Sequence, residues 1–484
     1  MTFGGALQVF IVQKKILLLE PLINPKIVWG RFHRHRGIIP PMGLIAIYTY
    51  MKTCGFDITF LDTNVGKWDE ETLRLKLAED KYDIAGISVF TTTADASFTT
   101  AKIVRDVLPN CLIVFGGIHP TILPEQTLNE CPDCNLLILG EGERTFRLCV
   151  ESIESDRPFY DVPNIAFRNS EGKPIVNSRT KEFFNLDELP VGFYSDIDLK
   201  PYMPHVTQYK RLPNYPLIIQ RGCPFRCIFC EASSVHGKKV RSYSCERVIR
   251  ELKILIEKKG ARGVYFQDST FTVNKKFVIS LCELMIKEQI DLAWSCTTRT
   301  DMLDRELMEA MKKSGCWQLL FGIESANQQS LDLLKKGTTV ENNRNAIDIA
   351  KEFGVQVSAS YILAIPGEDE EMVQNTINFA NEMATESALF YLPTPYPGSE
   401  LYKICKAEGT LREDAQWEEY LAIDYDNPIY VNPKLGVEKM KYYYKKAYKS
   451  YYSNPRVYLA NLKALKSWDD LKRTFRAARI FVDI

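Results

Sequence analysis

The sequence carries no excess of charge of either sign, since 61 Lys and Arg balance 61 Asp and Glu over 484 residues. A zero net charge supplies no long-range field for nucleic acid, so we expect no nucleic-acid partner. No run of residues approaches the ~18 apolar positions that a membrane-spanning helix needs. The apolar start, Met1–Val12, has neither a preceding positive residue nor a small-residue cleavage pattern, so we expect no secretory signal and a cytoplasmic location.

Repeats of solenoid period and low-complexity tracts are also absent. What remains is the composition of a soluble globular protein, with 45% hydrophobic and 25% charged residues. The length suggests about three domains. The 13 cysteines are odd in number and mostly scattered singly, which fits a reducing compartment where thiols stay available for metals.

Residues 15 to about 150 alternate short apolar runs with amphipathic segments. The expected strands are Ile16–Leu19, Ile58–Asp62, Ile84–Val89, Leu112–Phe115 and Leu136–Leu139. Five strand–helix units of this kind predict an α/β fold, with a doubly wound, Rossmann-like parallel sheet over residues 1–155. Ligands of such sheets bind beyond the carboxyl ends of the strands.

The next segment, residues 156–210, holds six prolines and little periodicity, which predicts a linker that packs on both flanking domains. The alternation then resumes, with expected strands Leu217–Gln220, Gly263–Phe266, Leu292–Cys296, Gln318–Gly322, Val357–Leu363 and Ala388–Leu392. Six units over residues 211–410 are too few for a closed eight-stranded barrel and predict a partial (β/α)6 barrel. We expect residues 411–484 to form a helical C-terminal region.

Three cysteines, Cys223, Cys227 and Cys230, follow the first expected barrel strand with the spacing Cys-x3-Cys-x2-Cys, and Phe229 precedes the last. Three thiolates in one loop can hold three irons of a [4Fe–4S] cluster, because soft sulfur ligands suit such clusters. The fourth iron is then open to a small molecule. This loop resembles the cluster loop of the radical S-adenosylmethionine (SAM) enzymes, in which the amino and carboxylate groups of SAM occupy the open iron.

Two other uses of these cysteines fit less well. Structural zinc wants four ligands, whereas Cys227 and Cys230 form a single pair and His236 and Cys245 would complete it at irregular spacing. A disulfide disagrees with a reducing compartment. Elsewhere, the Cys131-Pro-Asp-Cys134 segment has zinc-like spacing but no partner pair nearby, so neither zinc nor a second cluster of the methylthiotransferase kind is expected there.

The resemblance to radical SAM enzymes continues downstream and implies roles for four residues. Glu324, in Gly322-Ile-Glu-Ser325, would reach the ribose hydroxyls or amino group of SAM, and otherwise it is a surface acid at a strand end. Gly367, in Ile365-Pro-Gly-Glu368, would lie beside the adenine or form a simple turn. Asp268 would face the cavity, and Arg299 would bind the SAM carboxylate.

The N-terminal part resembles the cobalamin-binding domain found ahead of many radical SAM barrels. The resemblance rests on Pro40-Pro-Met-Gly-Leu44, Asp83–Ser88, Gly116-Gly-Ile-His-Pro120 and Gly140-Glu-Gly-Glu143, taken in this order. It implies a corrin across the strand ends, with candidate contacts at Ser88, Thr91, Gly116, Gly117, Gly140, Glu141 and Gly142. The Asp-x-His-x-x-Gly motif that supplies a histidine to cobalt elsewhere is missing, because neither His33 nor His35 has an Asp two places before it. His119 is either a loop histidine near the corrin or a structural one.

Together these features are identified with the cobalamin-binding radical SAM family. The resemblance implies an enzyme that uses a [4Fe–4S] cluster, SAM and cobalamin, most simply as a methyltransferase on an unactivated carbon or on phosphorus. Alternatives are an oxidative cyclase, ring-forming enzyme or deoxygenase, and a non-catalytic cobalamin or metal sensor. The expected partners are a small-molecule or lipid-like substrate, such as a tetrapyrrole, and a low-potential electron donor such as ferredoxin or flavodoxin.

The charge balance hides a basic C-terminal segment, in which 12 Lys and Arg and only two acids lie between Lys439 and Arg479, interleaved with Tyr442, Tyr443, Tyr444, Tyr448, Tyr451 and Tyr452. The interpretation we favour is a helix that packs its tyrosines on the body and leaves its lysines in water. The alternative is peripheral contact with an anionic membrane face.

Overall fold

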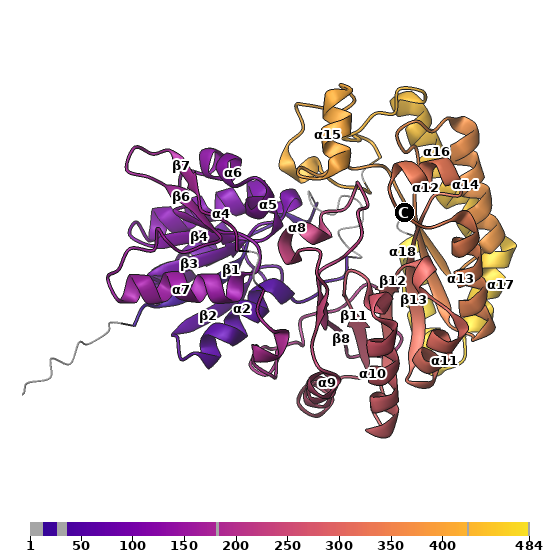
Figure 1. Ribbon diagram of the computed structural model, residues 1–484, viewed down its shortest axis with the longest axis horizontal. Coiled ribbons are helices and arrows are strands. Elements are labelled where there is room, and N and C mark those ends of the chain that lie inside the picture. Colours follow the sequence, from indigo (N-terminus) through magenta and orange to yellow (C-terminus); the bar gives the residue numbers. More distant parts are fainter. Residues whose placement is uncertain (1–12, 27–35, 181–182, 424, 483–484) are drawn as a thin grey trace, which may run out of the picture. The chain divides into compact units, whose positions relative to one another are not determined.

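The computed structural model describes residues 13–26, 36–180, 183–423 and 425–482 (Figure 1). These residues divide into two compact units. The first takes its residues from Met1–Leu22, Pro41–Phe90 and Ala96–Phe183, and the second from Ile23–Pro40, Thr91–Asp95 and Phe184–Ile484.

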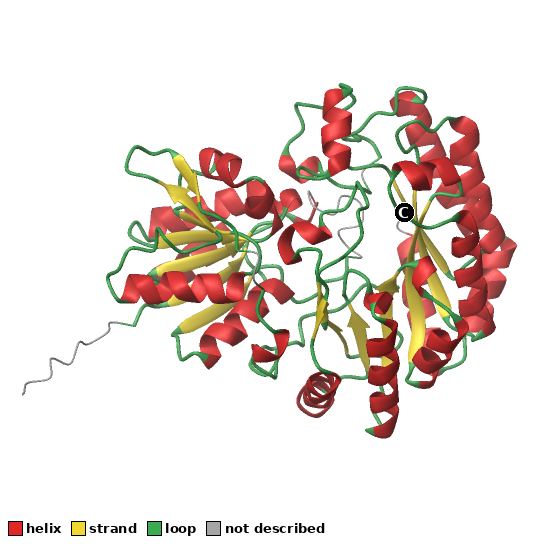
Figure 2. Cartoon of the chain, viewed as in Figure 1, coloured by secondary structure: helices red, strands yellow, loops and turns green. Residues whose placement is uncertain are grey.

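The first unit is built on a seven-stranded sheet of order β2-β1-β3-β4-β5-β6-β7, whose first five strands in that order are parallel (Figure 2). The strands are β1 Ile16–Glu20, β2 Ile58–Asp62, β3 Ile84–Ser88, β4 Leu112–Gly116, β5 Leu136–Ile138, β6 Ile165–Arg168 and β7 Pro174–Val176. The helices are α2 Met42–Thr53, α3 Glu70–Asp80, α4 Ala94–Val107, α5 Ile118–Ile122, α6 Pro124–Glu130 and α7 Gly142–Glu154. The strand order reverses at β1, so the expected doubly wound sheet is confirmed.

The buried central strands explain this architecture. Every residue of β1 is buried, and so are the first four of β3. Strands that are apolar on both faces need helices on both sides, which is the arrangement of a parallel sheet with crossover helices. Their carboxyl ends therefore meet at one edge, which carries the segments after Glu20, Asp62, Ser88 and Gly116.

The segment 156–210 differs from the expected linker. Its first half forms β6 and β7, which add antiparallel to β5 and belong to the first unit. Pro174 begins β7 at the sheet edge, where a missing N–H is tolerated, so the proline that suggested a linker lies in a short strand. The second half belongs to the second unit, where the buried Glu251 accepts the Gly192 and Phe193 N–H groups.

The second unit is built on a six-stranded, all-parallel sheet of order β15-β14-β13-β12-β11-β8, as a partial barrel requires. The strands are β8 Asn214–Leu217, β11 Gly263–Phe266, β12 Ala293–Thr298, β13 Cys316–Glu324, β14 Gln356–Ile362 and β15 Ser387–Tyr391. Strand β8 begins and ends three residues earlier than the expected strand Leu217–Gln220, and it includes Pro216. It is an edge strand, where proline does not interrupt a ladder.

The helices of this unit follow the strands in turn. They are α8 Ala232–His236, α9 Cys245–Lys259, α10 Lys275–Lys287, α11 Arg305–Lys313, α12 Gln328–Leu333, α13 Val340–Glu352, α14 Glu370–Met383, α15 Glu400–Ala407, α16 Gly436–Tyr452, α17 Pro455–Ala464 and α18 Trp468–Val482. A short antiparallel ribbon, β9 Gln220–Arg221 with β10 Arg241–Ser242, brackets the cysteine loop.

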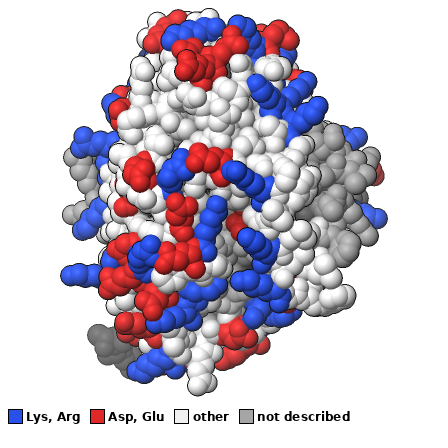
Figure 3. Space-filling model, turned by 90° about the vertical axis from the view of Figure 1, so that its right-hand side faces the viewer, with Lys and Arg blue, Asp and Glu red and all other residues white. Residues whose placement is uncertain are grey.

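Helix α16 packs its tyrosines on the edge strand β15, as the favoured interpretation of the C-terminal segment expected. The hydroxyl of Tyr448 bonds to both the N–H and the C=O of Phe390, and that of Tyr452 does the same for Ala388. Lys439 on the outer side pairs with Glu370 of α14 at 2.5 Å. On the face in Figure 3, Lys and Arg are interspersed with Asp and Glu. Within the described residues, no helix is both long and apolar enough to cross a membrane.

Candidate active site

The cysteine loop leaves the barrel at the carboxyl end of β8, as expected. The β9–β10 ribbon closes its base, and the Cys223 N–H donates to the Gly237 carbonyl at 3.2 Å. Gly222 has φ +100°, and a Cβ there would collide with the Lys239 carbonyl, so only glycine fits this turn. The backbone thus fixes the point from which the three thiols are presented.

Cationic side chains lie next to these thiols. The Arg299 guanidinium donates to Cys227 Sγ at 3.8 Å, and the Ala232 N–H donates to Cys230 Sγ at 3.4 Å. Burial raises the pKa of the Cys227 thiol, while the positive charges of Lys336 and Arg299 act in the opposite direction. These two cations would therefore offset part of the cost of burying a thiolate once a metal displaces the proton.

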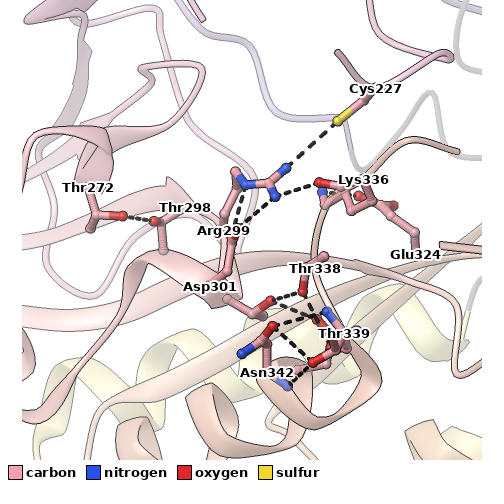
Figure 4. Close-up of polar contacts among 12 residues, drawn as sticks. Cys227, Thr272, Thr298, Arg299, Asp301, Glu324, Lys336, Thr338, Thr339 and Asn342 are labelled. Atoms are coloured by element: carbon pink, nitrogen blue, oxygen red, sulfur yellow. Dashed lines mark hydrogen bonds and ion pairs between the residues drawn. The ribbon is translucent and has the colours of Figure 1, made fainter. Parts of the chain in front are cut away.

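Arg299 is held on the loop side of the site by contacts in several directions (Figure 4). Its guanidinium donates to both carboxylate oxygens of Asp301 at 2.9 Å and to the Lys336 carbonyl at 2.5 Å. Its Cζ lies 3.8 Å from the ring centroid of Phe225, in the cysteine loop. These contacts direct Arg299 toward the loop, whereas the sequence predicted a role with the SAM carboxylate.

Glu324 forms a buried ion pair that the sequence did not predict. Its Oε1 lies 2.7 Å from Lys336 Nζ, and both side chains are 8% exposed. Glu324 has φ +65°, and the β13–β14 register shifts between Gly322 and Glu324. A non-glycine residue in this conformation is strained, and such strain is concentrated at functional positions. Glu324 is therefore a buried, paired acid and not a surface acid.

Gly322 makes room for this ion pair. A Cβ at Gly322 would collide with the Glu324 carboxylate and lie 2.9 Å from Lys336 Nζ. Lys336 Nζ also lies 6.0 Å from the ring centroid of Phe229, the aromatic residue before Cys230. The ion pair thus lies against the cysteine loop, and the structure brings together Cys227, Arg299 and Glu324 among the predicted site residues.

The turn that contains Gly367 is tied to the end of β13 by Glu368. The fully buried Glu368 carboxylate accepts the Ser325 hydroxyl at 3.1 Å, the Ser330 hydroxyl at 2.6 Å and the Ile365 N–H at 3.0 Å. Burial raises the pKa of Glu368, and these donors lower it. The Gly322–Ser325 and Ile365–Glu368 segments are therefore one rigid unit.

Asp268, which the sequence predicts to face the cavity, is buried and bonded to the backbone. Its side chain is 3% exposed, and Oδ1 accepts the N–H groups of Ile219 at 2.8 Å and Gln220 at 2.9 Å. Burial raises the pKa of Asp268 to about 7, against the effect of these two donors and of the Gln220 side chain. The residue holds the chain that leads into the cysteine loop.

At the carboxyl edge of the first sheet, the glycines differ in what they make room for. A Cβ at Gly116 would meet no heavy atom of the described residues within 4 Å. A Cβ at Gly117 would lie 2.7 Å from the Val89 carbonyl oxygen, and one at Gly142 the same distance from Ile47 Cδ1. Only Gly116 of these three thus leaves open space, while the other two are required by the protein's own packing.

The remaining candidates lie at the same edge. Ser88 ends β3 and acts to lower the pKa of the Glu20 carboxyl group, while the buried Thr91 begins a 3-10 turn. Gly140, with φ +82°, and Glu141 lead into α7, for which Glu141 is the N-terminal capping residue. His119 is 1% exposed and packs edge-on against Phe98, and burial lowers its pKa to about 4, which favours its structural role. His33 and His35 lie outside the described residues.

An acid pair at this edge escaped the sequence analysis. Glu20 and Asp62 end β1 and β2 and stand directly opposite in register, and both are buried. Burial, and then the Asp62 charge, raise the pKa of Glu20 to about 8. The sequence does carry a signal for this pair, because each of two expected neighbouring strands is followed by or ends in an acid. Like charges on neighbouring strands repel, so such a pair is unusual without a functional reason.

Cys131 and Cys134 are buried structural thiols. The Cys134 thiol donates to the Leu136 carbonyl at 3.4 Å, and Arg168 donates to the carbonyls of Cys131 and Cys134. Burial raises the pKa of Cys131 to about 11, so this thiol is protonated and inert at neutral pH.

Comparison with known proteins agrees with this geometry. The model of the radical SAM superfamily matches residues 217–380, and that of the B12 binding domain matches residues 31–150. An uncharacterized methyltransferase of Pyrococcus horikoshii is 32% identical over 431 residues, covering 87% of this chain and 90% of the relative. The chain belongs to the cobalamin-binding radical SAM family.

Other members of the family differ in activity. An anaerobic magnesium-protoporphyrin IX monomethyl ester cyclase of Rubrivivax gelatinosus is 28% identical over 75% of this chain, which spans 66% of the cyclase. The fold matches TsrM, a radical SAM methyltransferase of Kitasatospora setae whose structure contains cobalamin and a [4Fe–4S] cluster. That match has a TM-score of 0.72 at 15% identity and covers 97% of this chain and 99% of TsrM.

Membership makes the protein a radical SAM enzyme whose cofactors are a [4Fe–4S] cluster, SAM and cobalamin. The described residues fit the cluster: three cysteines share one loop, the Arg299 guanidinium donates to one of the sulfurs, and a backbone N–H donates to another. No three His, Cys, Asp or Glu side chains in the described ranges converge on a single-ion site. A cube binds each thiolate through a different iron and does not need that convergence. The open space beside Gly116 fits a ring lying on the first sheet's edge.

Proposed function

We propose that the enzyme is a cobalamin-dependent methyltransferase that acts on an unactivated carbon, or on phosphorus, of a small-molecule or lipid-like substrate. The observation that carries the radical half is the contact of the cysteine loop with Arg299 and with the Glu324–Lys336 ion pair. Methyl transfer is supported by the Pyrococcus horikoshii methyltransferase, which is similar along nearly its whole length.

The Glu324–Lys336 pair is suited to the amino-acid end of SAM. That end carries an ammonium and a carboxylate on one carbon, so Glu324 can accept from the ammonium while Lys336 donates to the carboxylate. Because the two charges compensate each other at 2.7 Å before SAM binds, neither is left buried and unpaired. Arg299 then contacts the cysteine loop, and Lys336 binds the SAM carboxylate, which is the role that the sequence assigned to Arg299.

The adenosine of SAM is proposed to lie along the segment that ends in Gly367. Glu368 fixes this turn against Ser325 and Ser330, and the Asn432 side chain donates to the carbonyls of Ile365 and Glu368 at 3.0 Å. A rigid turn presents its backbone groups to an adenine without a loss of loop entropy on binding.

When bound, the cluster and SAM supply a 5′-deoxyadenosyl radical, and cobalamin supplies the methyl group. The protein must then position the donors and exclude water. Tyr265, Ser295 and Thr298 on the barrel strands are buried, which keeps this end of the barrel dry. For the corrin we propose the edge that carries Ser88, Thr91, Gly116, Gly117, Gly140, Glu141 and Gly142, where the open space at Gly116 would admit a ring.

The proposed partners follow from the chemistry. A low-potential donor such as ferredoxin or flavodoxin would reduce the cluster in a cytoplasmic setting, and nucleic acid is not expected as a partner. Contact with a membrane through the basic C-terminal segment is the less favoured proposal, because α16 buries Tyr443, Tyr444 and Tyr451 and pairs Lys439 with Glu370.

A second candidate function is an oxidative cyclase or related ring-forming enzyme, which the similarity to the Rubrivivax gelatinosus cyclase favours. The same cluster and SAM site would begin that reaction. What differs is the fate of the substrate radical, so the two functions are separated by whether a methyl group is transferred.

Both functions can be distinguished without knowing the substrate. Protein made with cobalamin and purified anaerobically is reduced and incubated with SAM that carries a CD3 group. A methyltransferase transfers the label to the corrin and releases S-adenosylhomocysteine in equal amount. Formation of 5′-deoxyadenosine without labelled corrin would favour the cyclase. Neither product, from protein with a normal cluster spectrum, would contradict both and favour a sensor.

A further inference from the structure

Asp268 lies where the barrel ladder stops. The last ladder bond between β8 and β11 runs from the Gln267 N–H to the Leu217 carbonyl at 2.9 Å. The next N–H groups on the β8 side, those of Ile219 and Gln220, have the Asp268 carboxylate as acceptor. One side chain thus replaces the neighbouring strand at the point where the chain turns toward Cys223.

Water cannot take over this task. Ile219 is 1% exposed, and Gln220 and Asp268 are each 3% exposed. The Gln220 side chain is itself fixed, because its amide donates to the Phe271 carbonyl at 2.7 Å and accepts the Ser242 hydroxyl at 3.2 Å. The stretch that enters the cysteine loop is therefore held by three residues: Asp268 and Phe271 in the segment after β11, and Ser242 in β10.

The two oxygens of Asp268 are unequal. Oδ1 takes both backbone donors, while Oδ2 is buried and has no hydrogen-bond partner among the described residues. A ligand for SAM would need a reachable charge, whereas an acceptor for backbone N–H groups needs one oxygen in the right place. The geometry satisfies the second requirement and not the first.

We infer that Asp268 is a positioning residue for the [4Fe–4S] cluster, which sets the exit angle of the cysteine loop through the Ile219 and Gln220 N–H groups and makes no contact with SAM. This inference rests on the proposed radical SAM function. It predicts that cluster geometry depends on the Oδ1 acceptor of Asp268 and not on the negative charge of its carboxylate.

The test compares Asp268→Asn with Asp268→Ala in anaerobically reconstituted protein. Asparagine keeps an oxygen for the two N–H groups, and its flipped orientation is excluded because the NH2 would face two donors. We expect Asp268→Asn to keep the wild-type EPR spectrum of the reduced cluster, and SAM affinity within about twofold. Asp268→Ala should shift the EPR spectrum and weaken SAM binding about tenfold or more, since residues behind metal ligands typically have effects of 10–100-fold.

Asp304→Ala is the matched control. Asp304 caps α11 by accepting the Leu307 N–H at 2.9 Å, so this variant also loses an aspartate acceptor of a backbone N–H in the same barrel. The carboxylate of Asp304 pairs with Lys275, and its contacts among the described residues include none with the cysteine loop. It should lower the melting temperature and leave the EPR spectrum and SAM affinity unchanged.

Two results would overturn the inference. Loss of SAM affinity in Asp268→Asn with a normal cluster spectrum would make Asp268 a direct SAM ligand. An Asp268→Ala variant that behaves like Asp304→Ala would make it a purely structural residue. A wild-type protein that forms no [4Fe–4S] spectrum would instead contradict the proposed function itself.

Discussion

The two units present their candidate sites in opposite ways. At the strand ends of the second unit, charged side chains make the site: Arg299, Lys336 and Glu324 contact one another or the cysteine loop. At the strand ends of the first unit, the distinctive feature is an absent side chain at Gly116. A charged network fits a small zwitterion with few atoms, and open space fits a broad ring whose own surface supplies the contacts. A substitution should therefore impair the second unit when it removes a charged side chain, and the first unit when it adds a side chain at Gly116.

The largest effect is expected from removing a cluster ligand. Cys227→Ala should abolish formation of 5′-deoxyadenosine, because two thiolates cannot hold the cluster in a state that binds SAM. Corrin binding by the same protein should be unchanged. The measurements are anaerobic product assay and corrin absorption, and a normal yield of 5′-deoxyadenosine from this variant would refute the cluster assignment.

Adding a side chain should have the converse effect in the first unit. Gly116→Leu places a bulky group in the open space and should exclude the corrin while SAM cleavage continues. Gly117→Ala is the informative comparison, because its Cβ meets the Val89 carbonyl and should lower stability rather than block a ring. Corrin content after production with cobalamin measures the first effect and thermal unfolding the second. Full corrin content in Gly116→Leu would show that the ring does not lie at Gly116.

A smaller effect is expected from breaking the buried ion pair. Lys336→Met leaves the Glu324 carboxylate buried without its cation, which should lower stability by about 3–5 kcal/mol and weaken SAM binding. The double variant Lys336→Met with Glu324→Leu should regain stability but not SAM affinity. If the double variant bound SAM normally, the pair would be structural only. Denaturant unfolding and SAM titration followed by EPR give the two quantities.

The smallest effect concerns the acid pair of the first unit. The pKa of Glu20 is raised from 4.5 to about 8, so the folded state binds this proton more tightly than the unfolded chain does. Stability should therefore be complete below pH 4.5 and decline as pH rises to about 8. Glu20→Gln has no carboxyl group to titrate at this position. The difference between its melting temperature and that of the wild type should therefore rise between pH 4.5 and about 8, by about 2–4 °C for each kcal/mol that the wild type loses. Parallel curves for the two proteins would show that Glu20 does not titrate there.

Much of the fold follows from local patterns in the sequence. The first-unit strands β1 to β5 lie within one residue of their expected ends, because apolar runs buried on both faces are unambiguous. The start of β8 was missed because Pro216 argues against a strand unless the edge position is known. Strands β6 and β7 were missed for a similar reason: both are short, Pro163 lies two residues before β6, and Pro174 is the first residue of β7.

The site was predictable only where its residues are contiguous. The cysteine loop announces itself by spacing within eight residues. Lys336 pairs with a residue twelve positions earlier, and Asp268 binds N–H groups 48 and 49 positions away, so neither role has a periodic signal. A glycine in the sequence likewise does not tell whether it makes room for a ligand, as Gly116 does, or for the backbone, as Gly117 does.

The phenols of α16 have a consequence for how the chain behaves in a crowded solution. A partial barrel ends in an exposed strand edge, and an unpaired edge is a template for strand addition by another chain. Residues 388 and 390 on β15 lie about 6.6 Å apart along the strand, close to the about 6 Å rise between Tyr448 and Tyr452 on the helix. Two hydroxyls in that register occupy the backbone groups that a foreign strand would need. Helix α16 thereby protects the β15 edge from strand addition by another chain. The barrel can remain open at this edge because its backbone groups are already hydrogen-bonded.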